Sequence, residues 1–426
     1  LLHEIPNQTE LMTALTSWAT SIHSASEASG NVAKAFKQMK NHGCYKTVGL
    51  DCAMDILSQS EEAELIGVEE IDYLSIDDDA IKEAAKLLAD AKNPLIVVGG
   101  GAQEASEEIR ELAEMLQAPV NSNRMGHGVM DSRHYLAMRH PCGHKLWKKT
   151  DVVIAIGTRL QTSQMAWGVD DELKIIHLNT NLQELGRISK PTVALHVDAV
   201  RGTRAIVDTL STIIEIRSSR EDEYSALKKD FAEEISVLGP QIAWLNAIRD
   251  ALPDEGIFAS ELTQCGYVSR FAFDIYHPRT FVDTGFLGTL GYGFATALGA
   301  KVANPDVPVV SISGDGGFMF TVQELATAVL HKIAVVAIVF NDNAYGNVKR
   351  DQIEVYGNKV IASDLHNPDF TKMAESFGAR GVKVTSPEKL RVALKEAFNA
   401  DGPTVIEIPI GELPAPWEFI NLKKIR

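Results

Sequence analysis

Two acidic residues, Asp315 and Asp342, each follow a short apolar run of the chain. Asp315 comes after the run Val309–Ser313, within the sequence Gly314-Asp-Gly-Gly317, and Asp342 comes 27 residues later, after the run Ala334–Phe340. If the two runs are parallel strands joined by one helix, both carboxylates emerge at the edge of the sheet where open α/β sheets bind ligands. Two carboxylates with other oxygen ligands nearby form a site for a hard cation such as Mg²⁺ or Ca²⁺.

The glycines around Asp315 add an anion-binding feature to this pair. Gly314, Gly316 and Gly317 have no Cβ atoms, so a diphosphate could approach the backbone and accept hydrogen bonds from its N–H groups. A cation held by Asp315 and Asp342 would neutralise that diphosphate. Gly-Asp-Gly alone is also a common connection between a strand and a helix, but its spacing from the later Asn-Asp-Asn sequence favours a metal-bridged diphosphate clamp.

The elements that must position these residues fall into three blocks, which we expect to be domains: residues 1–75, 76–216 and 217–426. The first block shows helical patterns near Gln8–Ser24 and Ser29–Lys40 and a strand at Tyr45–Leu50. This is too little alternation for a complete α/β layer, so we expect this block to be the end of a larger, incomplete domain.

The second and third blocks alternate short β-branched runs with helical patterns, which is typical of parallel, doubly wound sheets. The acidic run Asp77–Asp79 favours the start of a helix, because carboxylates are stabilised at helix N-termini. We therefore predict an α/β fold of parallel doubly wound sheets flanked by helices. The predicted strands are Leu95–Val98, Asp151–Ile156, Lys174–Leu178 and Val193–Val197 in the second block, and Thr280–Val282, Val309–Ser313, Ala334–Phe340 and Thr404–Ile408 in the third. The predicted helices are Ala80–Ala91, Glu104–Leu116, Gly291–Val302, Val322–Leu330, Pro368–Phe377 and Pro387–Asn399.

The composition excludes several classes of function. The net charge of −16 argues against a nucleic-acid groove, which needs a basic surface. No apolar run approaches the roughly 18 to 20 residues that a membrane span needs. The four cysteines lie far apart without CxxC spacing, which fits a reduced, cytoplasmic protein better than a disulfide framework or a zinc site.

The pairing of Gly-Asp-Gly with Asn-Asp-Asn resembles the signature of thiamine-diphosphate enzymes of the acetolactate-synthase or 2-oxo-acid decarboxylase type. The resemblance implies thiamine diphosphate as the cofactor and Mg²⁺ as its metal, bound by Asp315, Asp342 and the backbone carbonyl of Ala344. Asp342 stands where many members have Asn, which adds negative charge but keeps an oxygen ligand. Tyr345 and Gly346, which end the motif, are implied as further cofactor contacts.

A second segment, Gly288-Thr-Leu-Gly-Tyr-Gly293, is similar to the family sequence Gly-Thr-Met-Gly-Tyr-Gly. By this resemblance Leu290 wedges between the two rings of the cofactor and bends it, and the carbonyl of Gly288 accepts a hydrogen bond from the pyrimidine amine. The alternative for Leu290 is a plain core residue beside a glycine-rich turn.

The resemblance extends to two further segments. Thr263-Gln-Cys265 stands where the family often has Gly-Gln-His, which implies that Gln264 and the backbone near Cys265 contact the cofactor. A nucleophilic Cys265 would need an acid or histidine partner, and none is apparent, so a buried spectator thiol is favoured. Leu2-His-Glu4 is similar to Phe-Gln-Glu of the pyrimidine-binding domain, which would let His3 face the substrate, although a lone histidine is more often structural.

The central block offers weaker patterns. Gly99-Gly-Gly101 is not GxGxxG and is more typical of a strand-to-helix turn than of a nucleotide site. Acetolactate synthases carry FAD on this domain, but Arg159–Gln164 lacks their acidic Arg-Phe-Asp-Asp-Arg pattern, which argues against FAD and leaves it as an alternative. His140, Cys142 and His144 have metal-ligand chemistry, but the surrounding sequence reads as a loop.

The implied activity is decarboxylation of a 2-oxo acid, carboligation, or both, in a homodimer or homotetramer with active sites between subunits. The glutamate that activates the cofactor in this family lies upstream of the matching region, so we do not expect to find it in this chain. Two alternatives follow: a catalytically silent cofactor-binding paralogue or regulatory subunit, and a Rossmann-type protein that binds another nucleotide.

Overall fold

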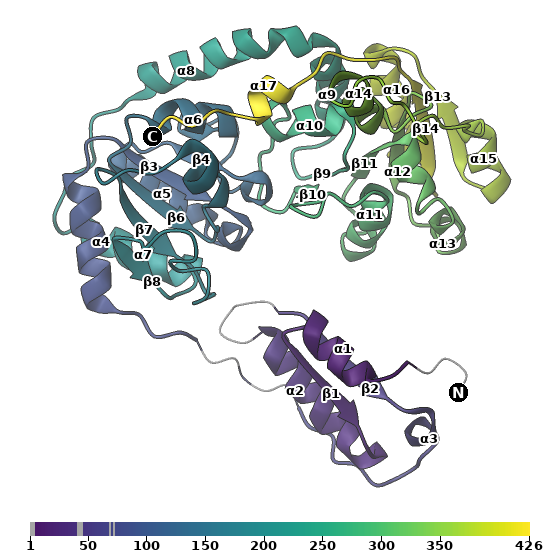
Figure 1. Ribbon diagram of the computed structural model, residues 1–426, viewed down its shortest axis with the longest axis horizontal. Coiled ribbons are helices and arrows are strands. Elements are labelled where there is room, and N and C mark those ends of the chain that lie inside the picture. Colours follow the sequence, from purple (N-terminus) through teal and green to yellow (C-terminus); the bar gives the residue numbers. More distant parts are fainter. Residues whose placement is uncertain (1–4, 41–45, 68–69, 71–72) are drawn as a thin grey trace.

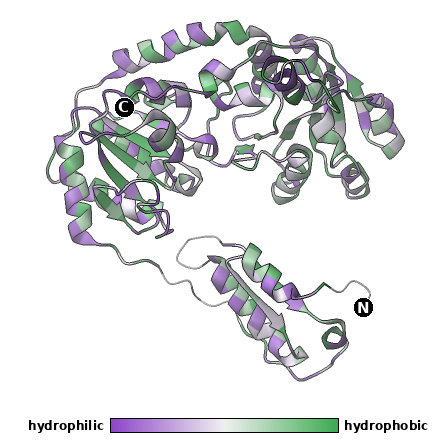
Figure 2. Cartoon of the chain, viewed as in Figure 1, coloured by the Kyte–Doolittle hydropathy of each residue, from purple (hydrophilic) through white to green (hydrophobic). Residues whose placement is uncertain are grey.

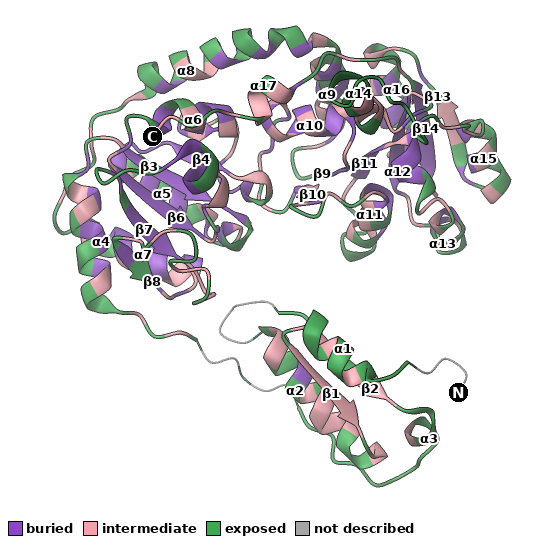
Figure 3. Cartoon of the chain, in the orientation of Figure 1, coloured by how far each residue is buried: buried purple, intermediate pink, exposed green. Residues whose placement is uncertain are grey.

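The computed structural model describes residues 5–40, 46–67, 70 and 73–426, and it contains one two-stranded and two six-stranded parallel sheets (Figure 1). Helices flank both large sheets, which confirms the predicted α/β fold class. The strands of the large sheets are mostly hydrophobic (Figure 2) and buried (Figure 3), as expected for parallel sheets covered on both faces. The predicted domain boundaries after residues 75 and 216 fall outside the three sheets and stay predictions.

The first block contains a helix and a strand where one long helix was predicted. The prediction of a helix over Gln8–Ser24 is wrong beyond Leu15, because residues 18–22 form a strand that pairs in parallel with the second strand. The aromatic and β-branched residues Trp18, Thr20 and Ile22 suit a pleated surface better than a helix. The elements are α1 (Gln8–Leu15), β1 (Trp18–Ile22), α2 (Ala28–Lys40), β2 (Val48–Cys52) and α3 (Met54–Leu57).

The central sheet has the strand order β5-β4-β3-β6-β7-β8. Asp77 caps helix α4 (Asp78–Asp90), the first helix of this region, by accepting hydrogen bonds from the N–H groups of Asp79 and Ala80, as the acidic run predicted. The strands are β3 (Pro94–Val98), β4 (Val120–Ser122), β5 (Ala137–Met138), β6 (Val152–Ile156), β7 (Lys174–Leu178) and β8 (Val193–Leu195). The α-helices are α4 (Asp78–Asp90), α5 (Ser106–Leu116), α6 (His140–Trp147) and α7 (Ala199–Leu210).

The third sheet has the order β10-β9-β11-β12-β14-β13, with β9 and β13 added to the four predicted strands. Two short helices, rather than the single predicted helix, connect β11 to β12. The strands are β9 (Ile257–Ser260), β10 (Phe281–Asp283), β11 (Val309–Gly314), β12 (Val336–Asn341), β13 (Arg380–Lys383) and β14 (Thr404–Pro409). The α-helices are α8 (Glu221–Glu234), α9 (Gly239–Ala251), α10 (Gln264–Ala272), α11 (Tyr292–Ala303), α12 (Asp315–Met319), α13 (Glu324–Leu330), α14 (Gly346–Glu354), α15 (Phe370–Phe377), α16 (Pro387–Ala397) and α17 (Trp417–Ile420).

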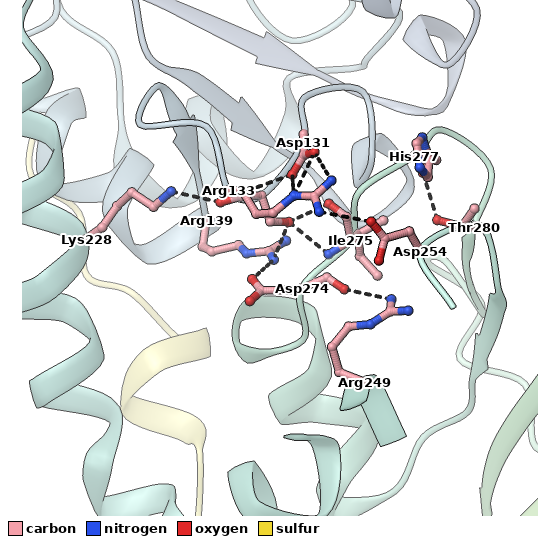
Figure 4. Close-up of polar contacts among 11 residues, drawn as sticks. Asp131, Arg133, Arg139, Lys228, Arg249, Asp254, Asp274, Ile275, His277 and Thr280 are labelled. Atoms are coloured by element: carbon pink, nitrogen blue, oxygen red, sulfur yellow. Dashed lines mark hydrogen bonds and ion pairs between the residues drawn. The ribbon is translucent and has the colours of Figure 1, made fainter. Parts of the chain in front are cut away.

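A cluster of charged and polar side chains joins the central sheet region to the third (Figure 4). Arg139 donates to the carbonyl of Phe273 at 2.7 Å and to a carboxylate oxygen of Asp274 at 3.1 Å. Ser132 and Ile275 exchange three hydrogen bonds, of 2.6, 2.9 and 3.0 Å. We call this the interdomain cluster, and its charged members are Asp131, Arg133, Arg139, Lys228, Arg249, Asp254 and Asp274.

The last part of the chain, yellow in Figure 1, leaves the third sheet and returns to the central region. There the N–H of Ile425 donates to the carbonyl of Trp167 at 2.9 Å, and Arg426 forms an ion pair with Asp170 at 3.0 Å. The tail therefore ties the two regions together a second time. Within the described ranges, no helix is both long and apolar enough to cross a membrane.

Candidate functional site

Asp315 lies at the carboxyl end of β11, where it begins helix α12. Its side chain is buried, and its carboxylate accepts hydrogen bonds from the N–H of Gly316 at 2.8 Å and from Nδ2 of Asn367 at 2.6 Å. Burial raises the pKa of Asp315, and these two hydrogen bonds oppose the rise. The fold therefore holds a carboxylate away from water in a fixed orientation.

Asp342 lies at the carboxyl end of β12, the strand that pairs in parallel with β11. One carboxylate oxygen accepts the N–H of Ala344 at 3.3 Å, and the other accepts Nε2 of Gln264 at 3.4 Å. Burial, and then repulsion by Asp315, raise the pKa of Asp342 to about 6. The repulsion of Asp342 by Asp315 reflects a local negative charge that a bound cation would neutralise.

The backbone after Asp342 is held by a neighbouring segment of the chain. Asn343 adopts the left-handed conformation with φ of 56°, and Ala344 forms an isolated antiparallel bridge with Asp364. The N–H of Tyr345 donates to the carbonyl of Ser363 at 2.8 Å. These contacts fix the backbone at Ala344, whose carbonyl is the predicted third metal ligand.

A cavity of about 280 Å³ opens at this edge of the third sheet. Its wall includes Leu290 and Gly288 from the turn before α11, and Gln264 from the start of α10. The structure therefore brings together every predicted cofactor contact except Cys265. The predicted contacts in the wall are Gln264, Gly288, Leu290, Gly314, Asp315, Gly316, Gly317, Asp342, Ala344, Tyr345 and Gly346.

Two predicted site residues do not appear in this wall. Cys265 is fully buried in the core, and burial raises the pKa of its thiol. The backbone N–H of Cys265 already donates to Oγ1 of Thr263 at 3.1 Å. His3 lies outside the described residues.

Two glycines of the cavity wall, Gly316 and Gly346, are required by close packing. A Cβ atom on Gly316 would lie 2.4 Å from Cε1 of Tyr345, and one on Gly346 would lie 2.5 Å from Oδ2 of Asp342. At Gly314, by contrast, nothing lies within 4 Å of where a Cβ atom would be, so the backbone there is open to a ligand. Carboxylate and carbonyl oxygens suit a hard divalent cation, so the residues present fit Mg²⁺ and a diphosphate.

Comparison with known proteins identifies two regions of the chain. Residues 81–206 match the family described as thiamine pyrophosphate enzyme, central domain, and residues 263–408 match thiamine pyrophosphate enzyme, C-terminal TPP binding domain. The chain belongs to the thiamine pyrophosphate enzyme family. This confirms the predicted resemblance, and the second match contains Asp315, Asp342 and most of the cavity wall.

Several curated proteins are similar to most of the chain. A probable acetolactate synthase large subunit of Methanococcus aeolicus is 33% identical over 362 residues, which are 78% of this chain and 60% of that protein. The acetolactate synthase of Bacillus subtilis is 32% identical (78% and 61% covered), and the sulfoacetaldehyde acetyltransferase of Castellaniella defragrans is 30% identical (77% and 62%). The chain thus spans about three fifths of the length of these relatives.

Two residues beside the cavity of this thiamine pyrophosphate enzyme were missed by sequence reasoning. Asn367 donates from Nδ2 to Asp315 and also to Oδ1 of Asn341 at 2.9 Å, so it links the ends of β11 and β12. Glu261 follows β9 and accepts hydrogen bonds from the turn that carries Leu290. Neither belongs to a motif with a known spacing, although an acidic residue two positions after the apolar run 257–259 was a usable signal for Glu261.

A larger cavity of about 680 Å³ lies between the central and third regions. Gly99 and Gly157, at the carboxyl ends of β3 and β6, contribute to its wall, and the strand order reverses between these two strands. A Cβ atom on Gly99 would lie 2.6 Å from the carbonyl oxygen of Gly157, which supports the interpretation of residues 99–101 as a tightly packed turn. Arg159 also lines the cavity, and the alternative of FAD here stays a prediction.

The other candidate metal residues are involved in packing. The His140 ring lies 4.6 Å from the Trp167 ring, and Nε2 of His144 is hydrogen-bonded to the carbonyl of Lys423 at 2.8 Å. Cys142 is buried in the core. Among the described residues, no three His, Cys, Asp or Glu side chains are grouped to hold a metal ion.

Proposed function

We propose that the chain forms the cofactor-binding part of a thiamine-diphosphate- and Mg²⁺-dependent enzyme that acts on a 2-oxo acid by decarboxylation, carboligation or both. The observation that carries this proposal is the single cavity that contains Asp315, Asp342 and Leu290. The names of the relatives, acetolactate synthases and an acetyltransferase, support a reaction of this class.

Each part of the cavity has a proposed role. Asp315, Asp342 and the carbonyl of Ala344 hold the cation, and the glycine-rich backbone around Asp315 faces the diphosphate. Leu290 separates the two rings of the cofactor, and the carbonyl of Gly288 accepts a hydrogen bond from its amine. When bound, thiamine diphosphate supplies an electron sink for the carbon that loses carbon dioxide.

The remaining wall limits the access of water. Phe340, Tyr345 and Trp417 line the cavity, and the ring of Trp417 packs against Tyr267 in an edge contact with centroids 4.9 Å apart. Excluding water lowers the local dielectric, which strengthens the attraction between the carboxylates and a cation. His3 remains a proposed substrate contact.

We also propose that the protein is a cytoplasmic homodimer or homotetramer, with its active sites between subunits. Large apolar side chains near the cavity support a covering partner, because Leu287, next to Gly288, is 90% exposed. Ile361, two residues before Ser363, is 75% exposed. Light scattering at several protein concentrations tests this assembly, and a monomer at all concentrations would contradict it.

The test of cofactor binding is thermal unfolding with and without thiamine diphosphate and Mg²⁺. A ligand that binds only the native state raises the melting temperature, and about 100-fold excess over Kd adds roughly 2.7 kcal/mol. Asp315→Ala should abolish the rise, whereas Asp306→Ala, an exposed aspartate of the same region, should keep it. No rise in the parent protein, or equal rises in both variants, would refute the proposal.

A panel of 2-oxo acids, scored for release of carbon dioxide, tests the reaction. Release that requires both thiamine diphosphate and Mg²⁺ is the expected result. Binding of the cofactor without release from any acid would instead favour the catalytically silent paralogue or regulatory subunit.

A further inference from the structure

The buried carboxylate of Glu261 lies behind the cavity wall, where three segments meet. Glu261 follows β9 directly and is 1% exposed. Its N–H donates to the carbonyl of Ile312 in β11 at 3.1 Å, so its backbone is fixed within the sheet. Its side chain is not part of the cavity wall.

The carboxylate accepts hydrogen bonds from three donors. Oε1 accepts the N–H of Gly291 at 3.0 Å, and Oε2 accepts the N–H of Gly293 at 2.8 Å and the hydroxyl of Ser313 at 3.1 Å. A carboxylate only accepts hydrogen bonds, so it matches these donors in a way that an amide cannot. No Lys or Arg of the described residues forms an ion pair with Glu261.

These bonds replace a helix cap that the local sequence does not supply. Gly291 is the N-cap of α11, with φ of 82°, and it has no side chain to accept the free N–H groups of the first turn. Glu261 supplies the acceptor from a distant strand, and its negative charge suits the helix N-terminus. The turn Gly288–Gly291, which carries Leu290, is therefore held at its end by Glu261.

The same carboxylate packs against the helix that begins with Asp315. A Cβ atom on Gly317 would lie 1.8 Å from Oε1 of Glu261 and 3.6 Å from Cδ2 of Leu290. Helix α12 thus contacts Glu261 directly on one side, while the Leu290 turn contacts it on the other. The position of Glu261 sets the separation between Leu290 and the Asp315 helix.

We propose that Glu261 is a positioning residue, which holds Leu290 in the place where it separates the two rings of the cofactor whose metal is held by Asp315 and Asp342. The inference rests on the proposed function, because it assigns Leu290 and Asp315 to the same cofactor. Glu261 acts through the backbone of the turn and does not itself touch the cofactor.

The test compares two probes that share the diphosphate but differ in the rings. Isothermal titration calorimetry measures Kd for thiamine diphosphate with Mg²⁺ and for inorganic diphosphate with Mg²⁺. The variant is Glu261→Gln, which keeps the size of the side chain but replaces one of the two acceptor oxygens by an NH₂ group that can only donate. The control is Asp198→Asn, which makes the same chemical change at the N-cap of α7, far along the chain from this cavity.

Glu261→Gln should raise Kd for thiamine diphosphate about tenfold, which corresponds to about 1.4 kcal/mol, and change Kd for inorganic diphosphate less than about twofold. The control should leave both constants unchanged. In a Leu290→Ala background, Glu261→Gln should cause no further loss for thiamine diphosphate, because its effect passes through Leu290.

Ser313→Ala, which removes one of the three donors, gives a milder test if Glu261→Gln does not fold. It should raise Kd for thiamine diphosphate about twofold to threefold without changing Kd for inorganic diphosphate. Equal losses for both probes, no loss for either, or a full further loss in the Leu290→Ala background would overturn the positioning role. Failure of the parent protein to bind thiamine diphosphate would overturn the proposed function, and this inference with it.

Discussion

Arg139 of the interdomain cluster should contribute much more to stability than Arg133 of the same cluster. The Arg139 side chain is only 16% exposed and donates to the carbonyl of Phe273, to Oγ of Ser132 at 2.8 Å and to Asp274. Replacing it by methionine keeps the apolar stem but leaves the acceptors without their charged donor. The perturbation therefore tests a buried polar connection between two domains.

The magnitude follows from the acceptors. Hydrogen bonds that involve a charged partner contribute about 1.5–3 kcal/mol each, and such contributions are not additive in a cluster. The Asp274 side chain is 58% exposed, so its ion pair is screened by solvent and adds little. Counting only the bonds to Phe273 and Ser132, Arg139→Met should lower the free energy of unfolding by about 3 kcal/mol.

Arg133→Met is the matched control. Arg133 pairs with Asp131 and Asp254, but its side chain is 56% exposed, and exposed pairs contribute little. Urea unfolding, followed by both fluorescence and circular dichroism, measures the two variants against the parent. If Arg133→Met destabilises the protein as much as Arg139→Met does, or if neither changes the transition, the reasoning from burial is wrong.

Three further predictions concern other parts of the chain. Burial lowers the pKa of His140 to about 4, so between about pH 6.5 and 4 the unfolded state binds a proton that the folded state does not. The free energy of unfolding should therefore fall by up to about 3 kcal/mol as the pH falls through this window. In acid-unfolding curves, His140→Phe should reduce the slope of the free energy of unfolding against pH. Burial raises the pKa of Cys142 to about 11 and also raises the pKa of Cys265, so mapping of alkylated peptides at pH 8 should find both thiols unmodified until the protein unfolds. Gly99→Ala should destabilise the protein by about 1–3 kcal/mol through overpacking, whereas Gly402→Ala, where a Cβ atom has open space, should change the urea midpoint little; equal effects would contradict the contact.

The strands and the cavity residues that could be predicted are those with local signals. β11 and β12 are short and mainly apolar, and Asp315 and Asp342 follow them directly, so their meeting at one sheet edge follows from strand geometry alone. The glycines near Asp315 also required no knowledge of distant residues. Local sequence was therefore enough to place most of the cavity wall.

The strand Trp18–Ile22 could not be separated from the preceding helix by periodicity. Its stability depends on parallel pairing with Val48–Cys52, which lies about 30 residues further along the chain. Such pairing is a tertiary effect that can override a helical pattern. The same limit applies to Asn367, which reaches Asp315 across 52 residues of sequence.

The close approach of Glu261 and Gly317 also limits how this sequence can change over evolutionary time. A side chain at position 317 would occupy the place of the carboxylate, since its Cβ would come within 1.8 Å of Oε1. Homologues that carry a larger residue at position 317 should therefore have a shorter residue at position 261, and the change at 261 should come first in their ancestry. The pair predicts an order of substitutions as well as a covariation, and ancestral reconstruction could examine both.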